Sequence, residues 1–137
     1  MIRNMLSLII GVLVGVIIIL MMEFIGQLAF PIPPNFDVSS TENLSEYIKE
    51  APLGALLFVI FGWATGSFGG GFMAALIAKE DLLRRSILTG IVLMAMGLAN
   101  LLSIPHPFWF WILGLSVFLP FAYWGGKIVE KYRNNTV

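Results

Sequence analysis

Residues 62–71 read GWATGSFGGG, with five glycines in ten positions, and the role of these glycines decides the class of fold. A phosphate-binding loop has its glycines after a strand and before a helix, usually with a lysine at fixed spacing. Here the stretch lies inside a hydrophobic run, and FMAALIA follows it instead of Lys-Ser or Lys-Thr. This context disfavours nucleotide binding and favours a role in helix packing.

Small residues recur at every fourth position through this stretch and beyond it: Gly62, Gly66, Gly70, Ala74 and Ala78. On an α-helix they form one stripe, along which another helix can approach closely. Van der Waals contact then holds the helices together, since lipid cancels the hydrophobic effect between them. Gly11 and Gly15 repeat the pattern in the first apolar segment. We therefore predict that the helix containing residues 62–78 is the packing centre.

Other small residues lie off this stripe. Gly69 and Gly71 permit either a local hinge or, as we favour, tight packing on several sides. The third apolar segment has two further sets at spacing four, which we also expect to pack: Ser86 with Gly90, and Ala95 with Ala99 and Ser103. The partner helix can belong to the same chain or to a second copy.

The composition is that of a membrane protein. The 137 residues are 58% hydrophobic and 12% charged, with a mean hydropathy of +0.91, unlike an ordinary soluble domain. The formal net charge is zero, and basic residues are not interleaved with aromatics as a nucleic-acid groove requires. Nucleic-acid binding is therefore not expected. There is no cysteine, which excludes disulfides and cysteine-based metal sites.

Four stretches are long enough to cross a bilayer, which takes roughly 20 apolar residues of helix. They cover residues 5–30, 53–78, 86–104 and 108–126, and residues 31–52 form a loop on the outer side. All four must be helical, because lipid offers no partner to an open backbone group. We predict an all-α fold, a single membrane domain over residues 1–137. The first stretch is too long for a signal peptide, and we expect it to be retained.

Basic residues predict the orientation of this four-helix bundle. Lys49 alone lies in the outer loop, and the other seven flank the opposite ends of the spans: Arg3, Lys79, Arg84, Arg85, Lys127, Lys131 and Arg133. Cytoplasmic loops carry the excess of lysine and arginine. Both termini are therefore expected in the cytoplasm.

The outer loop is expected to contain a short amphipathic helix. The segment PIPP at 31–34 ends the first span. Ser39 and Glu42 fit a capping box, and apolar residues at helical spacing follow. This pattern predicts a helix from about Thr41 to Glu50, with its apolar face on the outer leaflet or on the bundle mouth.

Polar residues near one face of the membrane form the candidate site. Glu23 is the only ionisable residue within the apolar spans, and such residues are functional candidates because charge in hydrocarbon is costly. It follows Met5 by about 18 residues, or about 27 Å of helix, which is near the outer headgroups. Gln27 and Asn100 reach a similar depth. The three either reach water as ordinary helix ends or form a polar cluster that binds a cation or a proton, with Asn100 or Ser103 donating to Glu23.

For the other polar and helix-breaking residues we expect simpler roles. Thr65 and Ser67 are expected to bond to carbonyls of their own helix, and Pro120 to bend the fourth helix. His106, the one histidine, lies in the turn SIPHPF and is expected to be solvated. No nucleophile has an evident base, so we expect no catalytic, cofactor-binding or metal-binding residues.

The chain resembles a group of small bacterial four-helix integral membrane proteins for which no activity is settled. The resemblance covers nearly the full length, through MIRNMLSLIIGVLVG, PIPP, GWATGSFGGGFMAALIA, GLANLLSIPHPFWF and PFAYWGGK. It implies a shared architecture in a bacterial inner membrane. Members of the group tend to carry an acidic residue in the fourth helix, where this chain reads WILGLSVF.

Together these features predict a structural or accessory subunit. It would contact the lipid bilayer, and a second copy or another membrane protein through its Gly-rich helix, without a cofactor. The alternative is a small oligomeric transporter or channel with its outer entrance at Glu23, Gln27 and Asn100. A transporter needs polar groups near mid-bilayer, whereas these lie near one face, which favours the first interpretation. An enzyme acting on lipid headgroups is the least favoured.

Overall fold

The computed structural model describes residues 2–34, 37 and 39–135. Over these residues the chain is helical and contains no strand: α1 (Ile2–Ala29), α2 (Thr41–Glu50), α3 (Leu53–Ile77), α4 (Leu82–Ser103) and α5 (Phe108–Asn135). All except α2 are long and apolar enough to cross a membrane. The predicted all-helical fold with four apolar spans is confirmed, and these helices indicate a multi-pass membrane protein. Residues 35, 36 and 38 of the predicted loop, and 1, 136 and 137, lie outside the described residues.

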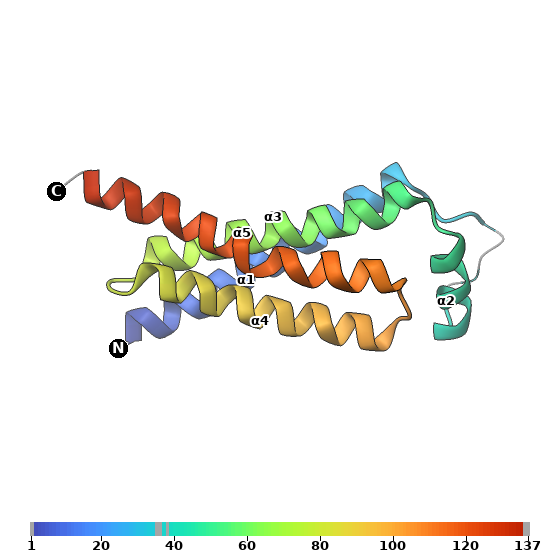
Figure 1. Cartoon of the computed structure of the whole chain (residues 1–137), viewed down its shortest axis with the longest axis horizontal. Coiled ribbons are helices and arrows are strands. Elements are labelled where there is room, and N and C mark those ends of the chain that lie inside the picture. Colours follow the sequence, from blue (N-terminus) through green and yellow to red (C-terminus); the bar gives the residue numbers. More distant parts are fainter. Residues whose placement is uncertain (1, 35–36, 38, 136–137) are drawn as a thin grey trace.

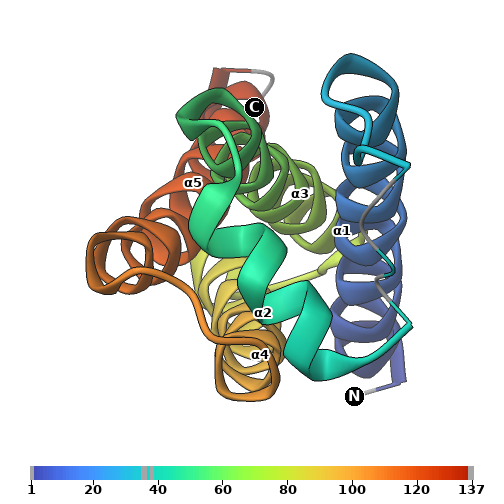
Figure 2. The same cartoon turned by 90° about the vertical axis from the view of Figure 1, so that its right-hand side faces the viewer.

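The four long helices run side by side, and α2 lies across one end of the bundle (Figures 1 and 2). Both termini lie at the opposite end. We call these the α2 end and the terminal end. The most extensive contacts are those of α3 with α1 and α5, while α4 packs against α3, α5 and α1. The Gly-rich helix thus contacts all three of the other long helices.

Three helices extend beyond the predicted spans. α1 begins at Ile2 rather than at residue 5, α4 begins at Leu82 rather than at residue 86, and α5 continues to Asn135 rather than ending at 126. The added residues include arginine, and in α5 also lysine, and such charged residues limit a span predicted from hydropathy. Both are good helix formers, and their long stems let the charge reach water while the backbone stays helical. α5 also changes direction along its length (Figure 1), and Pro120 lies inside it, as expected for a helix with an internal proline.

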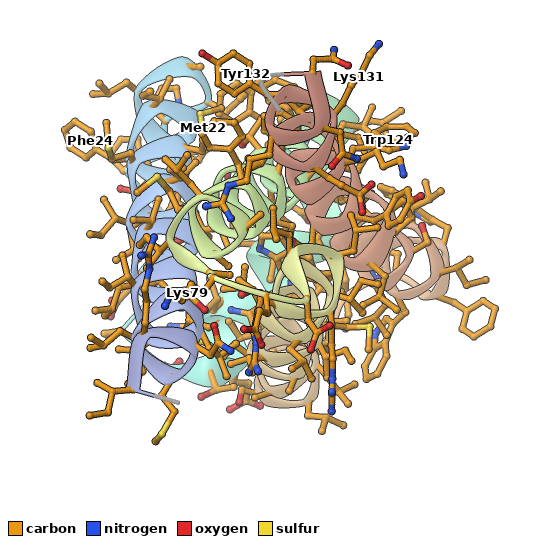
Figure 3. The ribbon with its side chains drawn as sticks, turned by 90° about the vertical axis from the view of Figure 1, so that its left-hand side faces the viewer. Met22, Phe24, Lys79, Trp124, Lys131 and Tyr132 are labelled. Atoms are coloured by element: carbon orange, nitrogen blue, oxygen red, sulfur yellow. The ribbon has the colours of Figure 1, made fainter. Side chains whose placement is uncertain are left out.

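The outward surface of the long helices is apolar. Phe24 and Trp124 point away from the bundle in Figure 3 and are 62% and 54% exposed. Large exposed apolar side chains continue along α1: Leu6, Ile9, Leu13, Ile17 and Leu20. A contiguous surface of this kind would be a liability in water and is typical of contact with lipid.

The backbones of α1 and α3 meet at the predicted small residues. A Cβ atom on Gly70 would lie 2.7 Å from the carbonyl oxygen of Gly11, and one on Gly66 would lie 2.8 Å from that of Gly15. Gly62 faces Met22, whose Cβ would lie 3.0 Å from an added Cβ, and Met22 points into the bundle (Figure 3). The remaining members of the stripe, Ala74 and Ala78, are fully buried.

A second face of α3 packs equally closely on α5, through glycines off the stripe. A Cβ atom on Gly71 would lie 2.7 Å from the Cα of Ala122, and one on Gly125 would lie 2.7 Å from the backbone nitrogen of Phe72. α3 runs without interruption through residues 69–71. The glycine triplet therefore packs on two sides, and the alternative of a hinge is not seen.

In α4 only part of the expected packing occurs. Ser86 and Gly90 are buried, whereas Ala95, Ala99 and Ser103 are exposed and do not pack within this chain. The buried face follows Leu93, Gly97 and Leu101. Ala95 comes two residues after Leu93, about 200° around a helix with 3.6 residues per turn, so the second set lies on the outward side.

The hydroxyl groups of the bundle have different partners. Thr65 donates to the carbonyls of Phe61 and Gly62 at 2.9 and 3.0 Å, as predicted. The Oγ of Ser67 is buried and, within the described part of the chain, has no hydrogen-bond partner, so that prediction was wrong. Ser86 instead joins two helices, because its Oγ donates to the carbonyl of Gly71 in α3 at 2.8 Å.

Two arginines cap the last turn of α3 at the terminal end. Arg3 Nε donates to the carbonyl of Ile77 at 2.7 Å. Arg133 donates to those of Ala78 and Leu76 at 2.9 and 2.7 Å. The last carbonyls of a helix have no partner inside it, and positive charge is favoured there by the helix dipole. The first turn of α1 and the last turns of α5 are thereby joined to α3.

We expect Gly70→Ala to lower the free energy of unfolding by about 1–3 kcal/mol, the usual cost of overpacking. The added methyl would meet backbone atoms of α1, which cannot rotate away. Gly69→Ala is the matched control, since its methyl would meet the flexible end of Ile18. Unfolding of both variants in detergent measures the difference. Equal losses at the two positions would contradict backbone contact as the cause.

Candidate functional site

The three predicted polar residues line one cavity at the α2 end of the bundle. Glu23 and Gln27 reach it from α1, and Asn100 reaches it from α4. Its volume is about 270 Å³. The side chains do not bond to one another: no hydrogen bond joins them in the described residues, and Ser103 donates to the carbonyl of Ala99 at 2.8 Å. The expected bonds from Asn100 and Ser103 to Glu23 are therefore not formed.

Helix α2 forms the roof of this cavity, which we call the α2 cavity. Leu44, Tyr47 and Ile48 line it from α2, and Ile48 is buried in the apolar core. Figure 2 shows α2 lying across the ends of the long helices. The apolar face of this short helix thus rests on the bundle mouth.

The N-terminus of α2 is capped one residue later than predicted. The Oγ of Ser40 accepts the backbone N–H of Asn43 at 3.2 Å. The N–H of Ser39 donates to Asp37 Oδ1 at 3.0 Å, and hydrogen bonding from Ser39 lowers the pKa of the Asp37 carboxyl. Ser39 therefore belongs to the turn before the helix, and Ser40 starts it. This turn sets where α2 begins above the cavity.

Aromatic side chains form part of the wall of the α2 cavity. Phe30, Tyr47 and Phe58 line it. The rings of Phe30 and Phe58 are tilted by 59° with centroids 6.3 Å apart, so they form a corner. A carboxylate and several aromatic faces therefore border the same space.

A second cavity, of about 210 Å³, adjoins the first. Glu23 and Asn100 line both spaces. The other described residues around the second cavity are apolar or glycine: Val16, Ile19, Leu20, Trp63, Leu93, Met96, Gly97 and Phe118. We call it the apolar cavity. It extends from the polar pair toward the middle of the long helices.

The α1–α3 seam differs between its two ends. Near the termini, glycines on α1 oppose glycines on α3. Toward α2, Gly26 instead opposes Phe58, whose Cδ1 would lie 2.9 Å from an added Cβ, and Gly54 opposes Phe30 at 3.0 Å. There a ring, rather than a second glycine, fills the space between the two helices. Backbone contact thus occurs toward the termini and ring contact toward α2, where the α2 cavity lies.

His106 is a cavity residue that the sequence did not indicate. It is half-buried rather than solvated, and its ring stacks on that of Phe110 with centroids 4.6 Å apart. Its Nδ1 lies 2.7 Å from the carbonyl oxygen of Ile104, so Nδ1–H donates. Burial lowers the pKa of His106 below 6.5, and the bond to Ile104 opposes that shift in part. The folded surroundings therefore favour the neutral imidazole. In the sequence, the neighbouring prolines and aromatic residues of SIPHPF were the features that could have indicated this position in the cavity.

The described residues contain no group of three or more histidines, aspartates or glutamates that could hold a metal ion. Glu23 and His106 are the carboxylate and imidazole of the α2 cavity. Among the described residues that line the cavity, the groups available for chemistry are therefore one carboxylate, two amides, one imidazole, the phenol of Tyr47 and the rings of two phenylalanines.

No protein family, curated protein or solved structure matches the chain. The resemblance to small bacterial four-helix proteins stays a prediction. The function is consequently argued from the bundle and its cavities.

We expect the protein to lose stability as the pH falls below about 6.5. Because the pKa of His106 is lower in the folded protein, the unfolded chain binds more protons between the folded and unfolded pKa values. The contribution of neutral His106 is full above the unfolded value and is lost as the pH falls to the folded one. Unfolding midpoints from about pH 7.5 to 5 should fall further for wild type than for His106→Gln. Parallel profiles of the two proteins would contradict this assignment.

Proposed function

We propose that the protein is a structural or accessory subunit of a membrane assembly. The observation that carries this proposal is the contact of the α3 backbone with α1 on one side and α5 on the other. Close backbone contact on two faces makes a rigid scaffold out of few residues. No catalytic role is assigned to any side chain.

The proposed partner surface is α4 rather than α3. A partner at the Gly-rich helix was expected, but α1 and α5 of the same chain cover the small residues of α3. Ala95, Ala99 and Ser103 form an exposed stripe of small residues on α4. A helix of another membrane protein, or of a second copy, can approach closely along such a stripe.

We further propose a bacterial inner membrane location, with both termini in the cytoplasm and α2 outside. The support is the charge of the terminal end, which carries Arg3, Lys79 and Arg133 and, in Figure 3, Lys131. Positive charge of this kind marks the cytoplasmic side. The α2 cavity then opens toward the outer face.

A small transporter or channel is the second candidate, favoured by one observation. Glu23, Gln27 and Asn100 line the same cavity, as an entrance would require. Toward the termini, however, the helices meet at Gly11, Gly70 and their neighbours. The proposal of an accessory subunit fits this backbone contact better.

We expect a photo-crosslinking amino acid at Ala99 to capture a defined partner in native membranes. The same group at Leu13, which is 56% exposed on α1, should capture lipid or nothing specific. Separation of the adducts by mass identifies a second copy or another protein. Absence of a protein adduct at Ala99, with the labelled variant folded and inserted, would remove the support for a partner on α4.

For the second candidate, proton and cation flux would be measured in liposomes holding wild type, Glu23→Gln or Glu42→Gln. Glu42 lies on the exposed side of α2 and serves as the control. We expect no flux above empty liposomes in any of the three. Flux that Glu23→Gln abolishes and Glu42→Gln preserves would replace the accessory subunit with a transporter.

A further inference from the structure

The α2 cavity and the apolar cavity form one amphiphilic site. They meet at Glu23 and Asn100, and taken together they fall within the range of about 300–1,000 Å³ typical of small-molecule sites. One end has a carboxylate and aromatic rings beneath α2. The other end has only apolar and glycine lining between the long helices. A ligand that fills both must have a polar head and an apolar chain.

The charge of the polar end selects the head group. Glu23 is half-buried, and within the described residues its carboxylate has neither an ion pair nor a hydrogen bond. No lysine or arginine is among the described residues that line either cavity. A carboxylate removed from water without a partner is costly, and a cation brought by a ligand would offset that cost.

The aromatic rings favour an organic cation over a metal ion. The faces of aromatic rings attract ammonium groups within about 6 Å of the centroid. Phe30 and Phe58 form a corner on the same cavity as Glu23. A metal would need several ligands held close together, and the described residues contain no group of three or more histidines, aspartates or glutamates that could supply them.

The apolar end limits the size of the chain. The apolar cavity holds about 210 Å³, and Gly97 and Phe118 close one side of it, since a Cβ on Gly97 would lie 2.6 Å from the ring. Leu20 and Met96 also line it and are exposed at the outer surface of the bundle, so this space is a groove between helices, and its volume accommodates a segment of one alkyl chain. Trp63 lines the space, so its indole is in contact range of the chain.

We propose that this site binds a single-chain alkylammonium amphiphile. The ammonium lies beside Glu23 and the rings of Phe30 and Phe58, and the chain enters the apolar cavity. Asn100 sits at the junction, where its amide contacts the head group. The inference concerns the cavities alone and holds whether or not the protein is an accessory subunit.

Quenching of Trp63 tests the site directly. The protein in phosphatidylcholine nanodiscs would be titrated with dodecylammonium brominated at the chain end, because bromine quenches a nearby indole. We expect saturable quenching, and loss of the saturable part in Trp63→Phe. The brominated alcohol and the brominated carboxylate of equal chain length should bind at least about tenfold more weakly, since neither brings a cation to Glu23.

Variants of the polar end complete the test. Glu23→Gln should weaken binding of the ammonium probe by about tenfold or more, and Phe58→Leu should weaken it by a smaller factor. The control Glu42→Gln should leave the binding unchanged. Thermal unfolding of each variant verifies the fold. Quenching that is linear in probe, equal for the three head groups, or unchanged in both Glu23→Gln and Phe58→Leu would overturn the proposal. Displacement of the probe by phosphatidylethanolamine would overturn the single-chain assignment.

Discussion

The structure depends on contact between the backbones of α1 and α3. Hydrocarbon is as apolar as leucine, so helices in a bilayer gain little from burying side chains, and close van der Waals contact must hold them together. The opposing glycines let the carbonyl oxygens of one helix approach the backbone of the other. α5 uses the same contact on a neighbouring face of α3 through Gly71 and Gly125. The position of α3 between two backbones determines where α4 can lie.

The character of the same seam changes along its length. Where glycine opposes glycine the two backbones are in contact, and where glycine opposes Phe58 or Phe30 a ring fills the space between the helices. The α2 cavity lies at the ring-filled end, where Phe30 and Phe58 line it. The order of small and large residues along α1 and α3 therefore decides which part of the seam borders the cavity. The short helix α2 covers this end of the bundle (Figure 2).

Much of this architecture can be predicted from the length of the hydrophobic runs and from the spacing of the small residues. The four spans are long apolar runs, and the depth of Glu23, counted along the helix, matched that of Asn100, with which it shares both cavities. The features that could not be predicted depend on which residues of other helices lie next to each side chain. The exposed stripe at Ala95 and Ala99 has the same spacing as the buried stripe at Gly66 and Gly70, and only the position of the partner helix separates them.

Residues outside the spans were the least predictable. A turn histidine is expected in water, but His106 is half-buried, with its ring stacked on Phe110 and its Nδ1–H bonded to the carbonyl of Ile104. Arg3 and Arg133 indicated only orientation in the sequence. Their bonds to the carbonyls of α3 form because the ends of three helices meet at this point. A hydropathy pattern does not predict which helix ends meet.

The arginine cap on α3 also has a consequence for biosynthesis. Chains emerge from the ribosome N-terminus first, so Arg3 is present when α3 is made, whereas Arg133 follows only after the whole of α5. Until then the carbonyls of Leu76 and Ala78 lack its guanidinium. A translation product that stops before residue 133 lacks two of the three arginine bonds at this helix end and keeps the bond from Arg3 to Ile77. The last bonds between α5 and α3 therefore form only after the rest of the bundle has been made.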